Sequence, residues 1–335
     1  MTLLYFTGFE SWGSDAVIDG WNTVGGTVQT SSNTPWSYGS SIKWTGTAIA
    51  YLPINIPSNS TSIIIGFNIY KNDTNIINIG LTSNATFTGG GTNSMAQFNS
   101  GSTTGNIIST SGTSTSFSYT GAKWNYIEIT TTLSNGNTVV KINGTVAGTS
   151  NGSSIFSPTL LFLSSSTTSS QTFIDDLYIL ANDGISPTAY LGRVRSGLAL
   201  PSAAGTYSNA LPYTNTNHYA NVNQVPNDGI TTVNNHTTVG SKDTYKISGL
   251  PTEQTTTGTT IVAARQRSLA QGVFISANVS NVTITSSEND SSNITNVSGT
   301  SFNAVVDLMV NDPATSSSWS PSTFTTMEIG TTLKS

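Results

Sequence analysis

A chain of 335 residues is long for a single β-sandwich and sufficient for two domains, each of which could bury about two thirds of its unfolded surface. Only 8% of the residues are charged, the net charge is −5 and there is no basic run, which excludes the phosphate neutralisation that nucleic-acid binding requires. The chain has no cysteine, which excludes disulfides, thiolate metal sites and cysteine catalysis.

Ser, Thr, Asn and Gly occupy the polar positions that charged residues fill in most proteins. Because Thr, Val and Ile pack well on pleated sheets and lose rotamer freedom in helices, this composition predicts an all-β protein. The first half reads as strands separated by polar turns. The predicted strands are residues 3–8, 41–51, 62–71, 76–81, 123–133, 138–147, 159–163 and 172–180, with weaker ones between 95 and 119.

One predicted hairpin turns at Ser134-Asn135-Gly136. Strand alternation places Ile127 and Ile129 on one face and Glu128 on the other, as a half-buried antiparallel strand requires. The Asn-Gly step is able to adopt the positive φ angles of a tight turn.

Four features over residues 1–183 are similar to a laminin-G or concanavalin-A-type jelly roll: an opening strand ending Gly8-Phe9-Glu10, then KWNYIEIT, VVKINGTVAG and FIDDLYIL. Hydrolases of that fold carry a Glu-x-Asp-x-x-Glu strand, which this chain lacks. Asp175 and Asp176 are strand neighbours that we expect to point to opposite faces, so they cannot form an acid–nucleophile pair. We therefore expect no catalytic residue and no enzyme.

Asp175 and Asp176 interrupt an otherwise apolar strand, and a buried carboxylate needs donors or a cation. One interpretation is capture by backbone N–H groups of a neighbouring loop. The other is a weak calcium site, as in some laminin-G relatives, which would need further oxygen ligands. No other metal and no cofactor is expected.

The turn formers at residues 182–187 predict a domain boundary, with a linker at 184–189 and a second β-sandwich at 190–335. Ser320-Pro321 predicts an N-cap and one helical turn through Phe324. Long exposed loops are expected at 101–118 and 286–300. The predicted strands of this half are residues 243–248, 259–267, 273–279, 301–310 and 327–333.

Residues 190–251 resemble a segment common in structural proteins of tailed bacteriophages. The matching elements, in order, are a G-x-V-R strand (192–195), a Pro-Ser-Ala-x-Gly loop (201–205), T-x-x-x-H-Y-A-x-V (214–222), Pro-x-Asp-Gly (226–229) and a G-x-K-D-x-Y strand (240–245). The resemblance implies a virion structural protein, a decoration or tail-associated component, and no particular chemistry.

Two groups of side chains are candidates for binding. Trp12, Trp21 and Trp36 fall on predicted loops, where indole rings can stack on sugars, whereas Trp44 and Trp124 fall in strands and are expected in the core. The arginines form two i, i+2 pairs on strand faces, which either anchor a partner or remain solvated. These four residues are Arg193, Arg195, Arg265 and Arg267.

The two histidines, His218 and His236, are too few for a three-histidine metal site, and we expect His218 to make a structural hydrogen bond. The start MTLLYFTGFE lacks the features of a signal peptide, and no apolar run reaches the about 18 residues of a membrane span. We therefore expect synthesis in a host cytoplasm, no membrane partner, and a final location in the virion.

The sequence leaves two functions open. The first is a non-catalytic virion component that contacts other capsid or tail proteins as a homo-oligomer, for which a trimer is one option. The alternative is an adhesin that recognises host surface glycan through the first domain, where even millimolar single-site affinity gains from multivalent display.

Overall fold

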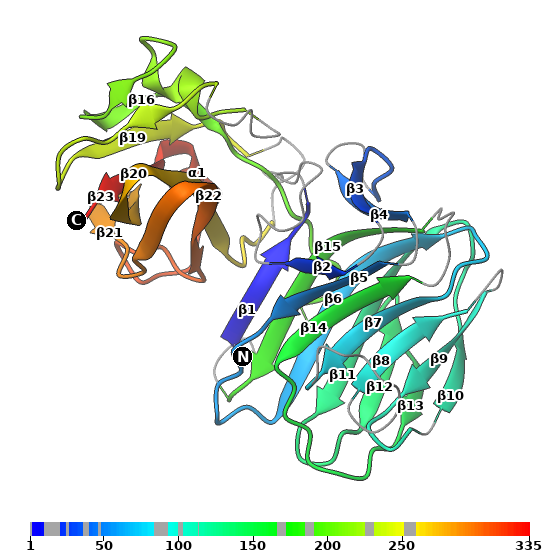
Figure 1. The fold of residues 1–335 in the computed structure, drawn as a ribbon. Helices are drawn as coiled ribbons and strands as arrows, with labels where there is room; N and C mark the ends of the chain where they lie inside the picture. The colour runs from blue at the N-terminus through cyan, green and yellow to red at the C-terminus, as the bar shows by residue number, and fades with distance from the viewer. Residues whose placement is uncertain are drawn as a thin grey trace. The chain divides into compact units, whose positions relative to one another are not determined.

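The computed structural model describes residues 2–9, 21–24, 27–35, 40–45, 48–83, 93–99, 103–112, 114–165, 172–184, 191–224, 231–250 and 259–335. The chain divides into two compact units, Met1–Ser196 (unit 1) and Gly197–Ser335 (unit 2). Both are built almost entirely of β-strands, as expected (Figure 1).

Unit 1 is a jelly-roll-like sandwich of two antiparallel sheets (Figure 1). Sheet A contains β1 (Thr2–Thr7), β3 (Thr27–Ser31), β4 (Ser41–Thr45), β6 (Ser62–Lys71), β11 (Trp124–Thr132), β12 (Thr138–Ile142), β13 (Thr145–Ser150) and β15 (Thr172–Asn182). Its order is β13-β12-β11-β6-β15-β4-β3, with β1 paired to β15.

Sheet B contains β2 (Asn22–Val24), β5 (Ala48–Pro53), β7 (Ile77–Thr82), β8 (Asn93–Phe98), β9 (Thr104–Ile108), β10 (Ser114–Ser118) and β14 (Leu160–Ser165). Its order is β10-β9-β8-β7-β14-β5-β2.

The core of unit 1 lies between the inner faces of these sheets. Alternate residues of β6, such as Ile65 and Phe67, pack there with residues of β7, such as Ile79. Each such side chain contributes roughly 1.5–3 kcal/mol when fully buried. The predicted hairpin is confirmed: Ile127 and Ile129 are buried in this core, β11 pairs with β12, and Gly136 takes φ +70°.

Three predictions for unit 1 were wrong. Residues 41–51 form two strands, β4 and β5, that belong to different sheets. Residues 138–147 form the hairpin β12–β13, because Asn143 (φ 51°) and Gly144 (φ 84°) make a second Asn-Gly turn. The loop expected at 101–118 contains the paired strands β9 and β10, which send apolar side chains into the core, so of the two predictions for this region the weaker strands between 95 and 119 are confirmed.

Unit 2 contains β16 (Pro201–Ser208), β17 (Leu211–Pro212), β18 (Asn234–Asn235), β19 (Lys242–Ile247), β20 (Ala264–Ile284), β21 (Glu288–Asp290), β22 (Thr295–Met309), the helix α1 (Pro321–Thr326) and β23 (Glu328–Leu333). A six-stranded sheet has the order β16-β19-β23-β20-β21, with β22 paired to β20, and β17 pairs with β18. A small apolar cluster includes Trp319 and Phe324.

The helical turn is confirmed: Ser320 caps α1 by accepting a hydrogen bond from Thr323 N, and Pro321 opens the helix. Residues 264–267 and 273–279 of two predicted strands are parts of one long strand, β20, which passes through register shifts near Gly272, whereas residues 259–263 precede it. The expected loop at 286–300 contains β21 and the start of β22.

The boundary between the units falls after Ser196, later than the linker expected at 184–189. The backbone N of Ser196 donates to Asp176 Oδ1 at 2.7 Å, so this segment is tied to β15. Residues 192–195, expected as a strand, lie outside any strand, and residues 201–205, expected as a loop, begin β16. In the part of the chain that the structure describes, no helix is long and apolar enough to cross a membrane.

Candidate functional site

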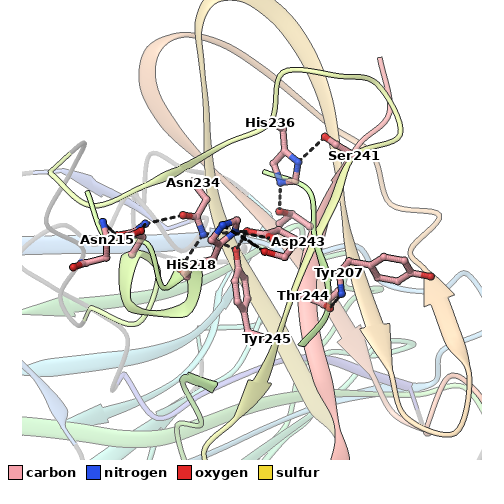
Figure 2. A network of polar contacts seen from close by, with 12 residues as sticks. Tyr207, Asn215, His218, Asn234, His236, Ser241, Asp243, Thr244 and Tyr245 are labelled. Carbon is pink, nitrogen blue, oxygen red and sulfur yellow. Dashed lines mark hydrogen bonds and ion pairs between the residues drawn. The ribbon is translucent and has the colours of Figure 1, made fainter. Parts of the chain in front are cut away.

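A polar cluster in unit 2 gathers side chains from segments that are distant in sequence (Figure 2). Asp243 and Tyr245 lie two residues apart on β19 and therefore share one face of the sheet. His218 begins the short 3-10 helix η2 (His218–Asn221), and Asn234 lies in β18. We call these four residues, with Asn221, the Asp243 cluster.

Asp243 is fully buried, and its carboxylate accepts hydrogen bonds from three side chains. These are His218 Nδ1 at 2.9 Å, Asn234 Nδ2 at 3.1 Å and Tyr245 OH at 2.6 Å. A buried carboxylate is tolerated only with such donors. Burial, and then the charge of Asp243, raises the pKa of Tyr245, so its phenol stays protonated as a donor.

The amide side chains extend this cluster to the neighbouring loop. Asn234 Nδ2 also donates to the carbonyl of His218 at 2.9 Å, and its Oδ1 accepts from Asn221 Nδ2 at 2.8 Å. Asn221, which is buried, closes a reciprocal pair with the backbone of Asn215. The η2 segment and β18 are therefore held to β19 through side chains.

His236 lies beside this cluster (Figure 2). Its Nδ1 is 2.8 Å from Ser241 Oγ, and its Nε2 is 3.1 Å from Thr331 Oγ1. Burial lowers the pKa of His236, the charge of Asp243 opposes that shift, and His218 adds to it. The neutral ring is therefore favoured in the folded protein.

A second polar group lies on the opposite face of β19, around Glu328. Its carboxylate accepts from Thr206 N at 2.6 Å and from Thr244 Oγ1 at 2.9 Å. A Cβ at Gly205 would lie 2.6 Å from Glu328 Oε2 and 2.5 Å from the Thr244 carbonyl. Only glycine fits at this position, which explains the glycine of the Pro-Ser-Ala-x-Gly element.

Ser208, His218 and Asp243 together have the residue types of a hydrolytic triad. Ser208 Oγ is exposed and lies 3.3 Å from His218 Nδ1 and 3.4 Å from Nε2. In a triad the serine lies on the Nε2 axis while the aspartate holds Nδ1. An oxygen almost equidistant from both nitrogens is off that axis, so this geometry does not present Ser208 to the histidine as a base.

Three parts of the segment 190–251, those containing Gly205, His218 and Asp243, thus come together in and around β19. The hydrogen bond expected of His218 is present, and its acceptor is Asp243. The Pro226–Gly229 turn lies outside the described residues. Sequence reasoning missed the partnership itself, although the i, i+2 spacing of Asp243 and Tyr245 on a strand was a signal for it.

Asp175 and Asp176 do not point to opposite faces, because a β-bulge intervenes between Asp175 and Tyr178. Asp176 has φ +52° and accepts from Asn68 Nδ2 at 2.9 Å, and Asn68 is the cross-strand partner of Asp175. Both carboxylates therefore lie on the outer face of sheet A.

The expected backbone capture occurs at these aspartates: Ser196 N donates to Asp176, and Asp176 N donates to Asp175 Oδ1 at 2.8 Å. Each residue is 2% exposed, which keeps a substrate away from both. Among the described residues no three His, Asp or Glu side chains gather to hold a metal, and the calcium site stays a prediction.

A third polar group, also on the outer face of sheet A, surrounds Glu128. Tyr126 OH and Tyr178 OH each donate to Glu128 Oε1 at 2.9 Å, and all three residues are buried. The ring of Tyr178 crosses over Gly66 to reach this position, and a Cβ on Gly66 would lie 2.1 Å from Tyr178 Cε1. Burial raises the pKa of Tyr126 and of Tyr178, so both remain donors.

The tryptophan prediction needs one correction. Trp21 has no exposed surface, donates from Nε1 to Tyr5 OH at 3.0 Å and belongs to the core, so it cannot stack on a sugar. It is buried because it packs edge-on against Tyr5 between the sheets. Trp12 and Trp36 lie outside the described residues.

The two arginine pairs differ in whether they share a strand face. Arg265 and Arg267 alternate with the buried Ala264 and Gln266 on β20 and share its other face, as expected. Arg193 and Arg195 do not share a strand face, because their segment forms no strand. Whether either pair contacts a partner stays a prediction.

Trp124 was expected in the core and instead lies on the outer face of sheet A. The adjacent residue Asn125 is buried and Ile127 belongs to the core, so alternation turns Trp124 outward. Cross-strand pairing aligns Trp124 with Tyr70, Tyr70 with Phe173, and Phe173 with Lys43. We call these four residues the aromatic row.

No protein-family model and no curated protein matches this chain. Among solved structures it is similar to a sialidase (TM-score 0.41, 13% identity), covering 54% of this chain and only 19% of the sialidase. The carbohydrate-binding module CBM66 from Bacillus subtilis has TM-score 0.34 and 10% identity, over 47% of this chain and 93% of the module.

A Bacillus subtilis protein of unknown function with a galectin-like fold has TM-score 0.37 and 8% identity, over 53% of this chain and 96% of its own. At such identities the likeness concerns the fold of about half the chain and transfers no activity.

Proposed function

We propose that this protein is a non-catalytic structural component of a tailed-bacteriophage particle, carried as a decoration or tail-associated subunit. The observation that carries the proposal is the Asp243 cluster. Three elements of the phage-type segment, those containing Gly205, His218 and the Asp243–Tyr245 pair, meet around one strand. If a segment recurs in structural proteins because of its fold, its own side chains should hold that fold together, as the hydrogen bonds of the Asp243 cluster do.

The hydrogen bonding of the Asp243 cluster also supports a structural role. Its carboxylate already accepts three side-chain donors, Ser208 is off the Nε2 axis of His218, and Asp175 and Asp176 are buried. A general acid or base must reach a substrate proton, and none of these groups is placed to do so.

In this proposal unit 2 mounts the protein on the particle, unit 1 faces solvent, and copies assemble around a symmetry axis of the virion, for which a trimer is one option. Arg265 and Arg267, partly exposed on one strand face, are the candidate contacts to an acidic neighbouring subunit.

Mass spectrometry of purified particles tests this function. The protein should be present in a fixed ratio to the major capsid protein across preparations and should remain after a high-salt wash and a density gradient. Its absence from washed particles of a phage that encodes it would reject the proposal. Cross-linking should then connect unit 2 to a capsid or tail protein.

A second candidate function, recognition of host surface glycan, is favoured by one observation. The aromatic row places partly exposed Trp124 and Tyr70 side by side on the outer face of sheet A, with ring centroids 5.8 Å apart. Aromatic rings bind sugars through their faces, and weak contacts suffice on a multivalent particle. Binding of the isolated protein to host cells tests this function.

A further inference from the structure

The aromatic row crosses four neighbouring strands of sheet A at one level. Trp124 on β11, Tyr70 on β6, Phe173 on β15 and Lys43 on β4 are successive cross-strand partners. The ring centroids of Tyr70 and Phe173 are 5.9 Å apart, and Lys43 Nζ lies 5.9 Å from the centroid of Phe173. Because strands are spaced about 4.8 Å apart, the row forms a line of roughly 15 Å across the sheet.

Beside the row, the next two levels of β11, β6 and β15 are closed. Two residues along each strand from the row, the cross-strand partners Tyr126, Asn68 and Asp175 are buried. At the next outward-facing position, Glu128 and Tyr178 are buried as well. In contrast, Trp124, Tyr70 and Lys43 are partly exposed. The row is therefore the level of these four strands at which apolar ring surface reaches solvent.

One lysine, Lys43 on β4, stands at the end of this line. It forms no ion pair with any residue that the structure describes. In contrast, Lys71, Lys242 and Lys334 each pair with a carboxylate.

This pairing pattern matters in a chain with net charge −5 and few cations. A lysine left without an acidic neighbour keeps its charge available to a ligand. Its attraction for an anion is strongest at low ionic strength and falls as salt screens it.

We propose that the aromatic row, with Lys43 at one end, binds an extended anionic polysaccharide laid across the strands. Sugar rings stack on Trp124 and Tyr70, and carboxylate or sulfate groups of the polysaccharide meet Lys43. A neutral glycan would leave this charge unused, and a compact ligand would contact only part of the line. This inference deepens the second function and does not rest on the virion role.

Polygalacturonate and its fully methyl-esterified form are matched probes, because they share a backbone and differ in charge. We expect the full-length protein to bind polygalacturonate by calorimetry or affinity electrophoresis, to bind the neutral ester at least about tenfold more weakly, and to lose affinity as salt is raised. A tenfold change corresponds to about 1.4 kcal/mol.

Variants locate the site. Trp124→Ala should weaken binding about tenfold or more, Trp124→Phe less, and Lys43→Gln several-fold with unchanged melting temperature. Lys246→Gln is the matched control, because Lys246 is an exposed lysine in unit 2 without an ion pair to any described residue, and it should bind as the original chain does. Lys43→Gln is a surface change and keeps the test valid where Trp124→Ala fails to fold.

Four outcomes would overturn the inference. These are no binding of either polymer, equal binding of both, loss of binding in Trp12→Ala or Trp36→Ala with Trp124→Ala unaffected, or a change of oligomeric state in Lys43→Gln by analytical ultracentrifugation. The last would show that the row meets another copy of the chain. Failure here, with the protein still present in washed particles, would leave the virion role standing.

Discussion

Unit 1 and unit 2 are both all-β, yet different interactions hold them together. The two sheets of unit 1 share one large apolar core, whose residues run in sequence from Tyr5 to Ala181. Unit 2 has small apolar clusters and places polar side chains in its interior, where Gln266 Nε2 donates to the Gly330 carbonyl at 2.6 Å and Thr283 Oγ1 donates to Gln266 Oε1 at 2.9 Å.

This difference determines how each unit responds to substitution. Apolar packing depends on volume, and similar side chains replace one another at modest cost. A buried polar network depends on every member, because one missing partner leaves the others unsatisfied. Unit 2 should therefore be the more fragile unit toward small polar changes, and the predictions below test that contrast.

The largest effect is expected from Asp243→Ala. The change leaves His218, Asn234 and Tyr245 without their buried acceptor, and each buried donor left unsatisfied costs about 1–3 kcal/mol. Hydrogen exchange should show lost protection in β19 while β6 of unit 1 keeps its protection. If urea titration showed a loss of less than about 1 kcal/mol in the free energy of unfolding, the Asp243 cluster would not be what stabilises β19 and the segments bonded to it.

Gly66→Ala tests the exception within unit 1, the buried polar group around Glu128. An added Cβ would meet the Tyr178 ring at 2.1 Å and push its hydroxyl from Tyr126 and Glu128, for an overpacking cost of about 3 kcal/mol or less. Combining the change with Tyr178→Phe should cost less than the two single changes added. Strict additivity would contradict the proposed contact.

A matched pair of small deletions compares the units directly. Ile65→Val removes one carbon from the core of unit 1 and should cost about 0.5–1.5 kcal/mol. Tyr245→Phe removes one oxygen from unit 2 and takes a donor from Asp243 and a partner from Asn234, at about 1–3 kcal/mol. If Ile65→Val proved the more costly change in denaturant titrations, the contrast between the units would fail.

The apolar alternation of unit 1 was readable from the sequence, and strands such as β6 and β11 were predicted within a residue or two. Alternation failed where local chemistry overrode it. The bulge at Asp176 turned both aspartates to one face, and the Asn143-Gly144 step made a turn inside an apparent strand. The expected loop at 101–118 hid two strands because Thr, Ser and Asn occupy their outward positions.

The candidate sites were harder to predict because they depend on contacts between distant segments. Nothing in the local sequence around Trp124 distinguishes an outward indole from a buried one, and its row appears only once β11, β6, β15 and β4 are aligned. Trp21, by contrast, was predicted on a loop but is buried against Tyr5. The Asp243 cluster likewise depends on the pairing of β18 with β17 and on the position of η2.

The smallest expected effect is a pH dependence confined to unit 2, from His236. Burial lowers the pKa of His236 below the ordinary value of 6.5, so the unfolded chain takes up a proton at a higher pH than the folded chain does. Between those two pKa values the unfolded state binds more protons, and stability rises with pH. The contribution is fully present above about pH 6.5 and is lost as the pH falls toward the folded pKa.

Urea midpoints of unit 2 at several pH values between 5 and 7.5 measure this slope, which should be shallower in His236→Gln. The glutamine keeps hydrogen-bonding capacity toward Ser241 and Thr331 but does not titrate. Glu288 and Asp290 do not interfere. A hydrogen bond from Lys242 holds the pKa of Glu288 below its ordinary value, and hydrogen bonds from Lys334 and Lys242 outweigh burial to do the same for the pKa of Asp290, so both titrate outside this window. If the urea midpoint of His236→Gln depends on pH as strongly as that of the original chain, another group causes the pH dependence. If the dependence is lost in unit 2 alone, a titrating histidine lies beside the Asp243 cluster, the network that makes this unit sensitive to polar changes.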